Sequence, residues 1–504
     1  MEYLLGVDFG GSSSKATLID LNGDIVCTAS REYPMYYPKD GWCEQSAQDC
    51  YEALVENIKS IFIKSGVDPK AVRAMAVDAA THMAVLLGTD DKPLRNVIHW
   101  SDRRSEKESQ WLNANYLDLL RKHCMNQPSP LWTLPQLMWL KEHEPEILSK
   151  TRKLLFMKDY LRHRLTGDYY TDRIEAMGAM MMDENQGCWD SELCQLAGLD
   201  VSVMPELKDP TDLAGYPTAD ACAATGLSPK TMVIVGTTDT ALEVYASGSI
   251  HPGQATVKLA TAGRICPVTP EGICHEMLVN YRHVVPGMWY PGTANKTCAA
   301  SYRWYRDLLC KPEMDEARER GMDPYEVMNE AAILTPPGAD GLVFHPYLQG
   351  ESTPYMDNNL RASFIGASSF HTKGHFSRAV MEGVCFSLRD SLNLLKELGV
   401  APETANIIGG GAKSPLWSQM TADILNLPLR KAKSDDSSLG SAMLAGVACG
   451  AFSSFQDSVD KCARFDKTYF PNPQNVEIYN GYFARYKAIH DVLAPIYSKD
   501  WSKQ

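Results

Sequence analysis

A short apolar run that begins at Tyr3 reaches the carboxylate of Asp8, and a turn of glycine and serine follows it. The turn offers free backbone N–H groups, serine hydroxyls and one ammonium, which together suit the oxygens of a phosphate group. Asp8 is free to hold Mg²⁺ directly or through water. An ordinary hairpin turn is the alternative interpretation. The candidate phosphate contacts are Gly10, Gly11, Ser12, Ser13 and Lys15.

A second carboxylate, Asp239, follows the β-branched run Val233 to Val235 and a few small residues. Open α/β sheets place their ligands at the carboxyl ends of strands, where this side chain is expected to lie. A carboxylate there can accept a hydroxyl proton during phosphoryl transfer, a step otherwise governed by positioning and charge neutralisation. The alternative is an aspartate that only caps a helix.

Three consecutive glycines, Gly409 to Gly411, stand between a buried strand and a predicted helix start at Ser414-Pro415. Residues without side chains let a ligand approach the backbone, and a helix N-terminus favours an anion. The segment is not a P-loop, because the glycine before Lys413 is absent and Ile407 stands where the first glycine should be.

Two polar stretches, Thr81-His82 and Trp100 to Arg104, each follow an apolar run. A hydroxylated substrate needs such donors and acceptors together with an aromatic wall. As alternatives, His82 could be a core histidine, and Asp102 could form an ion pair with the neighbouring arginines.

The elements that must position these residues follow from the apolar pattern. Runs at Tyr3 to Phe9 and Ala16 to Leu21, with an Asn22-Gly23 turn before a third run, predict an antiparallel meander. Strand-like and helical runs then alternate, which indicates an α/β domain. In the second half, Ala255 to Leu259 and Arg264 to Val268 flank a small-residue turn and repeat the opening pattern.

This repeat predicts two α/β domains with a cleft between them and one turn on each wall. A chain of 504 residues is long enough for two cores. The Gly- and Ser-rich stretch at 245–253 marks the expected boundary. We therefore divide the chain into residues 1–247 and residues 248–504.

Composition excludes several classes of function. The formal net charge of −13 argues against nucleic-acid and anionic-membrane partners, which favour a basic face. The N-terminus lacks the basic region of a signal peptide, and no run reaches the ~20 apolar residues that cross a bilayer. The 14 cysteines are scattered and contain no Cys-x-x-Cys pair, so we expect reduced thiols and a cytoplasmic protein.

Taken in order, these motifs resemble the FGGY family of carbohydrate kinases, over nearly the whole chain. The matching residues are Gly6–Gly10, Trp42-x-Glu44-Gln45, Trp100-x-Asp102-x-Arg104, Lys158–Leu161 with Leu165–Gly167, Gly236–Thr240, Pro346–Leu348 with Gly350, Glu351 and Pro354, Arg378–Gly383, Gly409–Ala412, and Leu439–Ala442. The resemblance implies two ribonuclease-H-like domains, as in actin and hexokinase, with ATP and sugar in the cleft. A homodimer is common among family members.

The resemblance also assigns roles. Asp239 would be the catalytic base, and Asp8 would position Mg²⁺ and the γ-phosphate. The residues that match acceptor-binding positions are Thr81, His82, Trp100, Asp102, Arg103 and Thr240. Those that match nucleotide-binding positions are Gly10, Gly11, Ser12, Ser13, Lys15, Thr261, Gly350, Gly410 and Gly411.

The pattern around His82, Asp102 and Arg378 is closest to that of the xylulokinases, so D-xylulose, giving D-xylulose 5-phosphate, is the expected acceptor. The alternatives are L-xylulose, ribulose, gluconate, glycerol and erythritol. Departures at Ala260-Thr261-Ala262 and Thr81-His82-Met83 leave the acceptor open. A sugar sensor without phosphotransfer and an actin-like ATPase remain rival interpretations.

Overall fold

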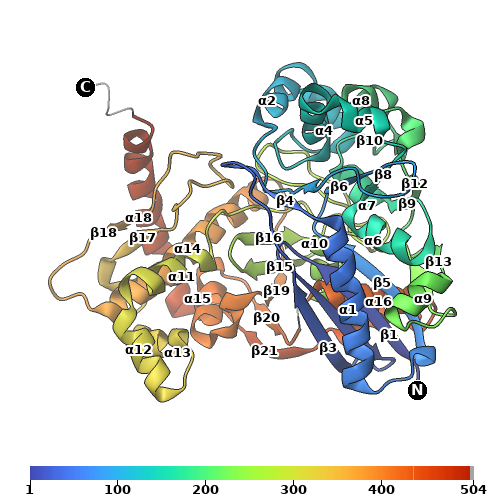
Figure 1. The fold of residues 1–504 in the computed structure, drawn as a ribbon. Coiled ribbons are helices and arrows are strands. Elements are labelled where there is room, and N and C mark those ends of the chain that lie inside the picture. Colours follow the sequence, from blue (N-terminus) through green and yellow to red (C-terminus); the bar gives the residue numbers. More distant parts are fainter. Residues whose placement is uncertain (435, 500–504) are drawn as a thin grey trace.

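The computed structural model describes residues 1–434 and 436–499, and it contains two lobes that are each built around a sheet (Figure 1). Helices surround both sheets, and the sheets lie next to one another in the middle of the molecule. The predicted α/β architecture is therefore observed in both halves of the chain.

The first lobe contains a six-stranded sheet. In spatial order its strands are β13 (Leu213–Gly215), β14 (Met232–Ile234), β5 (Val72–Ala79), β1 (Tyr3–Phe9), β2 (Ser13–Asp20) and β3 (Ile25–Glu32). Strand β2 pairs antiparallel with both β1 and β3, which confirms the predicted meander. Strand β5 pairs parallel with β1 and has only one exposed residue, because both faces of this sheet are covered.

The second lobe contains a five-stranded sheet that repeats the topology of the first. Its order is β16 (Gly263–Pro267), β15 (Gln254–Leu259), β19 (Thr404–Ile408), β20 (Leu429–Ala432) and β21 (Phe465–Tyr469). Strand β15 pairs antiparallel with β16 and parallel with β19, just as β1 pairs with β2 and β5. The internal repeat predicted from the sequence is confirmed.

Helices and small sheets complete the first lobe. The helices are α1 (Ala47–Ser65), η1 (Pro69–Ala71), α2 (Glu106–Asn115), α3 (Leu117–Cys124), α4 (Thr133–His143), α5 (Pro145–Lys150), α6 (Met157–Thr166), α7 (Arg173–Gly178), α8 (Ser191–Leu196), η2 (Val201–Val203), α9 (Ala219–Thr225) and α10 (Asp239–Ala246). The paired short strands are β4 (Glu44–Gln45) with β7 (Val97–Ile98), β6 (Ala84–Leu87) with β8 (Lys153–Phe156), β9 (Tyr170–Asp172) with β12 (Glu206–Lys208), and β10 (Met182–Asp183) with β11 (Cys188–Trp189).

Within the described residues, the second half contains the 3-10 helices η3 (Ala339–Gly341) and η4 (Gly410–Lys413) and the strand pair β17 (Val343–His345) and β18 (Ser363–Ile365). The same residues also form eight α-helices. They are α11 (Ala299–Leu309), α12 (Lys311–Arg320), α13 (Pro324–Ile333), α14 (Lys373–Glu397), α15 (Pro415–Leu425), α16 (Ser437–Ala448), α17 (Phe455–Cys462) and α18 (Pro473–Tyr497). Helix α15 starts as predicted, with Pro415 in its first turn and Ser414 as the N-cap that accepts from Trp417 N.

Helix α16 comes late in the chain but packs on strands β1 and β5 of the first sheet. A Cβ atom on Gly6 would lie 1.9 Å from the carbonyl oxygen of Ser438, so only glycine permits this approach. The apolar core of the first lobe accordingly includes Leu439 and Ala442 to Ala445 beside Leu4 and Leu242. A division of the chain at residue 247 stays a prediction, and α16 crosses it.

Candidate active site

Three carboxylates gather where strands of the first sheet end. Asp8 lies near the end of β1, and Asp78 is its Cα partner on β5. Burial raises the pKa of Asp8 to about 7, a hydrogen bond with Asp78 opposes this rise, and the charges of Asp239 and Asp436 add to it. Asp8 nevertheless keeps some solvent exposure.

Asp78 is fully buried beside Asp8, and the same burial raises its pKa well above the ordinary value. Ser441 of α16 donates its hydroxyl to Oδ2 at 2.5 Å, whereas Oδ1 receives no hydrogen bond from any described residue. An unfilled acceptor is costly inside a protein. Carboxylate oxygens are the ligands that Mg²⁺ prefers, so these residues fit a divalent cation held at Asp8.

Asp239 is the first residue of α10, and Thr238 is the N-cap. Its Oδ1 accepts from the backbone N–H of Thr240 at 2.6 Å and from the Thr240 hydroxyl at 3.2 Å. Burial raises the pKa of Asp239 to about 6, and the charge of Lys258 opposes this rise. A carboxylate with a pKa near neutrality is suited to act as a general base.

The loop before Asp239 is held by a buried ionic network. Arg162 of α6 donates to the carbonyl of Val235 at 2.7 Å, and Thr237 donates its hydroxyl to Asp172 at 2.7 Å. Gly236 has a positive φ of 70°, and a Cβ there would lie 2.7 Å from a carbonyl oxygen of β5. These contacts fix the conformation of the loop that connects the strand to Asp239.

The first turn lies between β1 and β2, and Gly11, Ser12 and Ser13 are exposed. Gly10 N donates to Ser13 O at 3.0 Å, which closes the turn. The ammonium of Lys15 donates to Asp436, the N-cap of α16, at 2.7 Å. The structure therefore brings these residues to the same sheet edge as Asp8, while their phosphate contacts stay a prediction.

The second turn, at Ala260 to Ala262, joins β15 to β16 and packs on the start of α11 through Cys298 N and Ala299 N. Thr261 is exposed at its tip. Neither alanine has a positive φ, so the departure from glycine at these positions causes no backbone strain.

The three glycines after β19 differ in what surrounds them. A Cβ on Gly409 would lie 2.7 Å from Leu259 O, and one on Gly411 would lie 2.8 Å from the Leu259 side chain. Gly410 has open space instead, with nothing within 4 Å of an added Cβ. Only Gly410 therefore lacks a packing reason to be glycine, which fits its predicted contact with a nucleotide. Gly350 does have such a reason, because a Cβ would lie 2.6 Å from Asp357 O.

His82 lies in a cluster of aromatic side chains, one of which, Tyr281, feels the charge of Asp239. It stacks on Trp132 at 4.5 Å between ring centroids, and its Nε2 is 2.6 Å from the hydroxyl of Tyr281. The Thr81 hydroxyl also bonds Tyr281. Burial lowers the pKa of His82 to about 3, so the ring is neutral, and its Nδ1 has no hydrogen-bond partner among the described residues.

The stretch from Trp100 to Arg104 splits into exposed and buried members. Trp100 and Arg103 are exposed, whereas Asp102 is buried and accepts from Cys43 N at 2.6 Å and from the Arg104 guanidinium at 2.8 Å. The ion-pair alternative for Asp102 is therefore observed. A contact of Trp100, Asp102 or Arg103 with an acceptor stays a prediction.

Several residues near Asp239 had not been predicted from the sequence. They are Asp78, Lys258, Arg264, Tyr281 and Tyr290. One sequence feature could have indicated Asp78, because this carboxylate comes at the end of an apolar strand. In the sheet it lies next to Asp8. The two tyrosines lie in an irregular segment between β16 and α11, where no periodic pattern was available.

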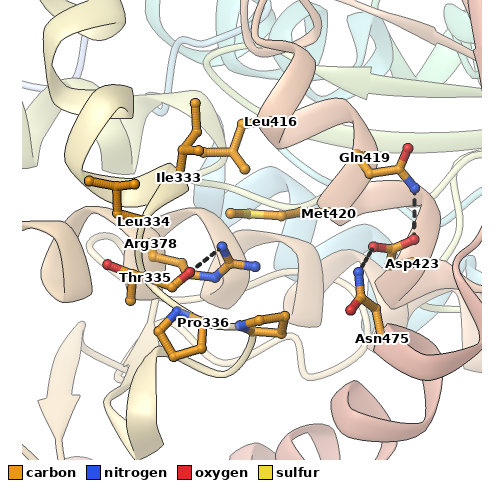
Figure 2. Close-up of a pocket in the computed structure, with 11 residues that line it drawn as sticks. Ile333, Leu334, Thr335, Pro336, Arg378, Leu416, Gln419, Met420, Asp423 and Asn475 are labelled. Atoms are coloured by element: carbon orange, nitrogen blue, oxygen red, sulfur yellow. Dashed lines mark hydrogen bonds between the residues drawn. The ribbon is translucent and has the colours of Figure 1, made fainter.

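A separate cavity of about 380 Å³ lies between α13, α14, α15 and α18 (Figure 2). Its polar side chains are occupied by one another or by the backbone: Asp423 accepts from Gln419 and Asn475, and Arg378 donates to Thr335 O. It contains none of the strand-end carboxylates, so the site described above is the better candidate for chemistry.

Comparison with known proteins agrees with this geometry. The model of the N-terminal domain of the FGGY family of carbohydrate kinases matches residues 3–245, and that of its C-terminal domain matches residues 254–449. The chain belongs to the FGGY family of carbohydrate kinases. It is an enzyme of the sugar kinase class, and ATP is the phosphoryl donor of that class.

The similarity to known relatives covers almost the entire length of this FGGY kinase. It is 32% identical to a xylulose kinase of Bacillus subtilis, with 97% of each chain covered. It is 30% identical to a gluconokinase of the same organism, covering 90% of this chain and 89% of the other. The ligand-bound xylulose kinase of Lactobacillus acidophilus superposes with a TM-score of 0.89 at 27% identity, covering 99% of both chains. The predicted two-domain actin- and hexokinase-like fold class is confirmed.

Within the described residues, no helix is long and apolar enough to cross a membrane.

Proposed function

We propose that this FGGY kinase transfers the γ-phosphate of ATP to a hydroxyl of an open-chain sugar, with Asp239 as the general base. The observation that carries the proposal is a carboxylate at the start of α10 whose pKa is raised to about 6. Its charge acts on Asp8 and on Tyr281, the hydrogen-bond partner of His82. D-Xylulose, giving D-xylulose 5-phosphate, is the acceptor that the relatives named xylulose kinase support.

Every bond formed or broken in the phosphoryl transfer, and the proton that is released, can be accounted for. The acceptor hydroxyl oxygen forms a bond to the γ-phosphorus, the bond between that phosphorus and the β,γ-bridging oxygen breaks, and ADP leaves. The hydroxyl proton passes to Asp239, whose Oδ1 is oriented by Thr240. The neutral ring of His82 and the hydroxyl of Tyr290 are available to bind acceptor hydroxyls.

Asp8 and Asp78 would hold Mg²⁺, which supplies charge neutralisation on the transferring phosphates when it is bound. The turn at Gly10 to Ser13 would contact those phosphates, and Gly410 would lie against the nucleotide. Support comes from the unfilled Oδ1 of Asp78 and the open space above Gly410.

Replacement of Asp239 by Asn tests the assignment. We expect kcat to fall by about 10³-fold while the KM for ATP changes little, because the base acts only in the chemical step. Asp220→Asn is the matched control, since Asp220 is also in the first turn of a helix but is exposed. Release of ADP is measured with Mg·ATP and D-xylulose. Undiminished turnover in the Asp239 variant would exclude the base assignment.

Gluconate is a second candidate acceptor, because gluconokinases also match most of the chain and because Arg264 places a positive charge near His82. L-Xylulose, ribulose, glycerol and erythritol belong in the same assay. Binding of ATP without turnover on any acceptor would favour a sugar sensor, and turnover without an acceptor would favour an ATPase.

We also propose a cytoplasmic homodimer. All cysteines of the described chain are free, which supports a reducing compartment, and dimers are common in the family. Light scattering on the purified protein tests the dimer, and a monomer at micromolar concentration would contradict it.

A further inference from the structure

Arg264 is the second residue of β16, directly after the second turn. Its Cα partner across the hairpin is Lys258, so the two cationic side chains leave the same face of the sheet. That face is directed at the first lobe, because Lys258 meets Glu243 of α10 at 2.7 Å. The hairpin therefore carries two positive charges toward the helix that begins with Asp239.

Only one of these charges is neutralised. Glu243 pairs with Lys258, whereas no carboxylate oxygen of the described chain lies within 4.0 Å of the Arg264 guanidinium. Arg264 also makes no hydrogen bond with any residue in the described ranges. It keeps partial solvent exposure, as Asp8 and Asp239 do.

The neighbours of Arg264 are aromatic. Its pKa is raised overall: burial lowers it, and the nearby Cys266, Tyr281, Tyr290 and Glu243 side chains raise it by more. The hydroxyl of Tyr290 is buried without a partner among the described residues, and so is Nδ1 of His82. A guanidinium with so little water around it loses hydration, and an anion that binds it in a bidentate manner restores the lost interactions.

The position of Arg264 shows which ligand would supply that anion. The charge of Arg264 acts on His82, on Asp239 and on Tyr281, whose hydroxyl is 2.6 Å from Nε2 of His82. The pKa of Asp8 is instead raised mainly by burial and is further influenced by Asp78, Asp239 and Asp436. Arg264 thus lies on the acceptor side of the base, and the phosphates of ATP belong on the side of Asp8. The missing anion is part of the acceptor.

We infer that Arg264 binds a carboxylate of the acceptor, so that the preferred substrate is an open-chain sugar acid of the aldonate type. This inference rests on the proposed function, because it assumes transfer to an acceptor between His82 and Asp239. It separates the two candidate acceptors: gluconate has the required carboxylate and D-xylulose does not. Arg264 is then a specificity-determining residue, since it contacts the substrate away from the reacting hydroxyl.

Matched acceptors test the inference. D-Gluconate and D-glucitol share a carbon skeleton and differ only in a carboxylate against a hydroxymethyl group at one end; D-xylonate and xylitol form a shorter pair. For the natural protein we expect kcat/KM to favour the acid of at least one pair by about 10- to 100-fold, the range of a hydrogen bond to a charged group. D-Xylulose is assayed alongside as the neutral ketose.

Substitutions of Arg264 test whether this residue causes the preference for the acid over the matched alcohol. Arg264→Gln should remove the advantage of the acid over the matched alcohol while the alcohol changes by less than about 3-fold, because only the carboxylate loses its partner. Arg264→Lys keeps the charge but not the planar fork and should restore part of the advantage. Arg318→Gln, an exposed arginine on α12, is the matched surface control. Quenching of tryptophan fluorescence by D-gluconate without ATP gives a readout of binding alone, since Trp132 stacks on His82.

The results of these assays distinguish the carboxylate assignment of Arg264 from the proposed kinase function. Preference for D-xylulose over every acid, or an equal loss on acid and alcohol in Arg264→Gln, overturns the carboxylate assignment while the kinase proposal survives. An equal loss would assign Arg264 to the transferring phosphoryl group. Absence of ADP release with all acceptors, together with intact ATP binding, overturns the proposed function itself.

Discussion

The β1–β2 and β15–β16 hairpins share one topology and differ in charge. At equivalent register positions the first hairpin pairs Asp8 with Lys15, and the second pairs Lys258 with Arg264. The parallel neighbours differ as well, since Asp8 has Asp78 beside it and Lys258 has Ile408. One backbone motif thus supplies an acidic wall in one lobe and a basic wall in the other.

This difference shows how a repeated fold can hold opposite ligands. The acidic wall suits a metal ion with the phosphates that it neutralises, and the basic wall suits an anion. The strand pairing of both hairpins is the same, so the chemistry is set by side chains just behind each turn. Three substitutions examine that distinction.

The largest effect is expected from Asp8→Asn, which removes the central charge of the acidic wall. We expect kcat to fall by about 10²-fold or more and the Mg²⁺ concentration for half-maximal rate to rise, because a metal ligand is weakened. Titration of the rate with MgCl₂ at saturating ATP checks this. An unchanged magnesium dependence would move the metal contact away from Asp8.

An intermediate effect, on stability rather than on rate, is expected from Asp78→Asn. The pKa of Asp78 is raised in the folded protein, so its contribution to stability is present below the unfolded pKa and is lost as pH rises through the folded value. Asn has no such loss. Relative to the natural protein, the variant should gain at least about 1 kcal/mol between pH 4 and pH 8, since one pKa unit corresponds to about 1.4 kcal/mol.

Thermal unfolding of both proteins in EDTA at the two pH values measures that gain. Asp220→Asn, on the exposed first turn of α9, should show no pH-dependent difference. Equal midpoint differences for Asp78→Asn at pH 4 and pH 8 would contradict the raised pKa.

The smallest effect is expected from Ala262→Gly in the second turn. Ala262 is exposed and has no positive φ, so its methyl group costs the backbone nothing. We expect the KM for ATP to change by less than about 3-fold, which is within the usual range for an unstrained surface position. A large improvement in ATP affinity would show that the alanine obstructs the nucleotide.

The sequence predicted the parts of this fold that local patterns determine. Both hairpins, the helix start at Ser414-Pro415 and the strand-end position of Asp239 follow from residues close together in the chain. The placement of α16 does not, because its contacts with β1 and β2 join residues more than 400 positions apart, as in the pair Thr17 of β2 and Ser438.

The candidate site shows the same limit. Asp8, Asp239 and His82 lie in motifs that the sequence showed, and their roles stay predictions. Arg264 and Tyr281 could not be found in the same way, because their relation to His82 exists only after the two lobes meet. Asp102 was ambiguous because a carboxylate followed by arginine fits both a ligand contact and an ion pair, and the structure contains the ion pair.

The late helix α16 also affects how the protein is made. The first sheet is covered by residues 437–448, so its apolar face on β1 and β5 stays uncovered while a ribosome adds the second lobe. At about 5 to 20 residues per second, roughly 200 further residues take about 10 to 40 s. During that interval the nascent N-terminal half exposes a surface that a chaperone would recognise, and the half expressed alone would retain it.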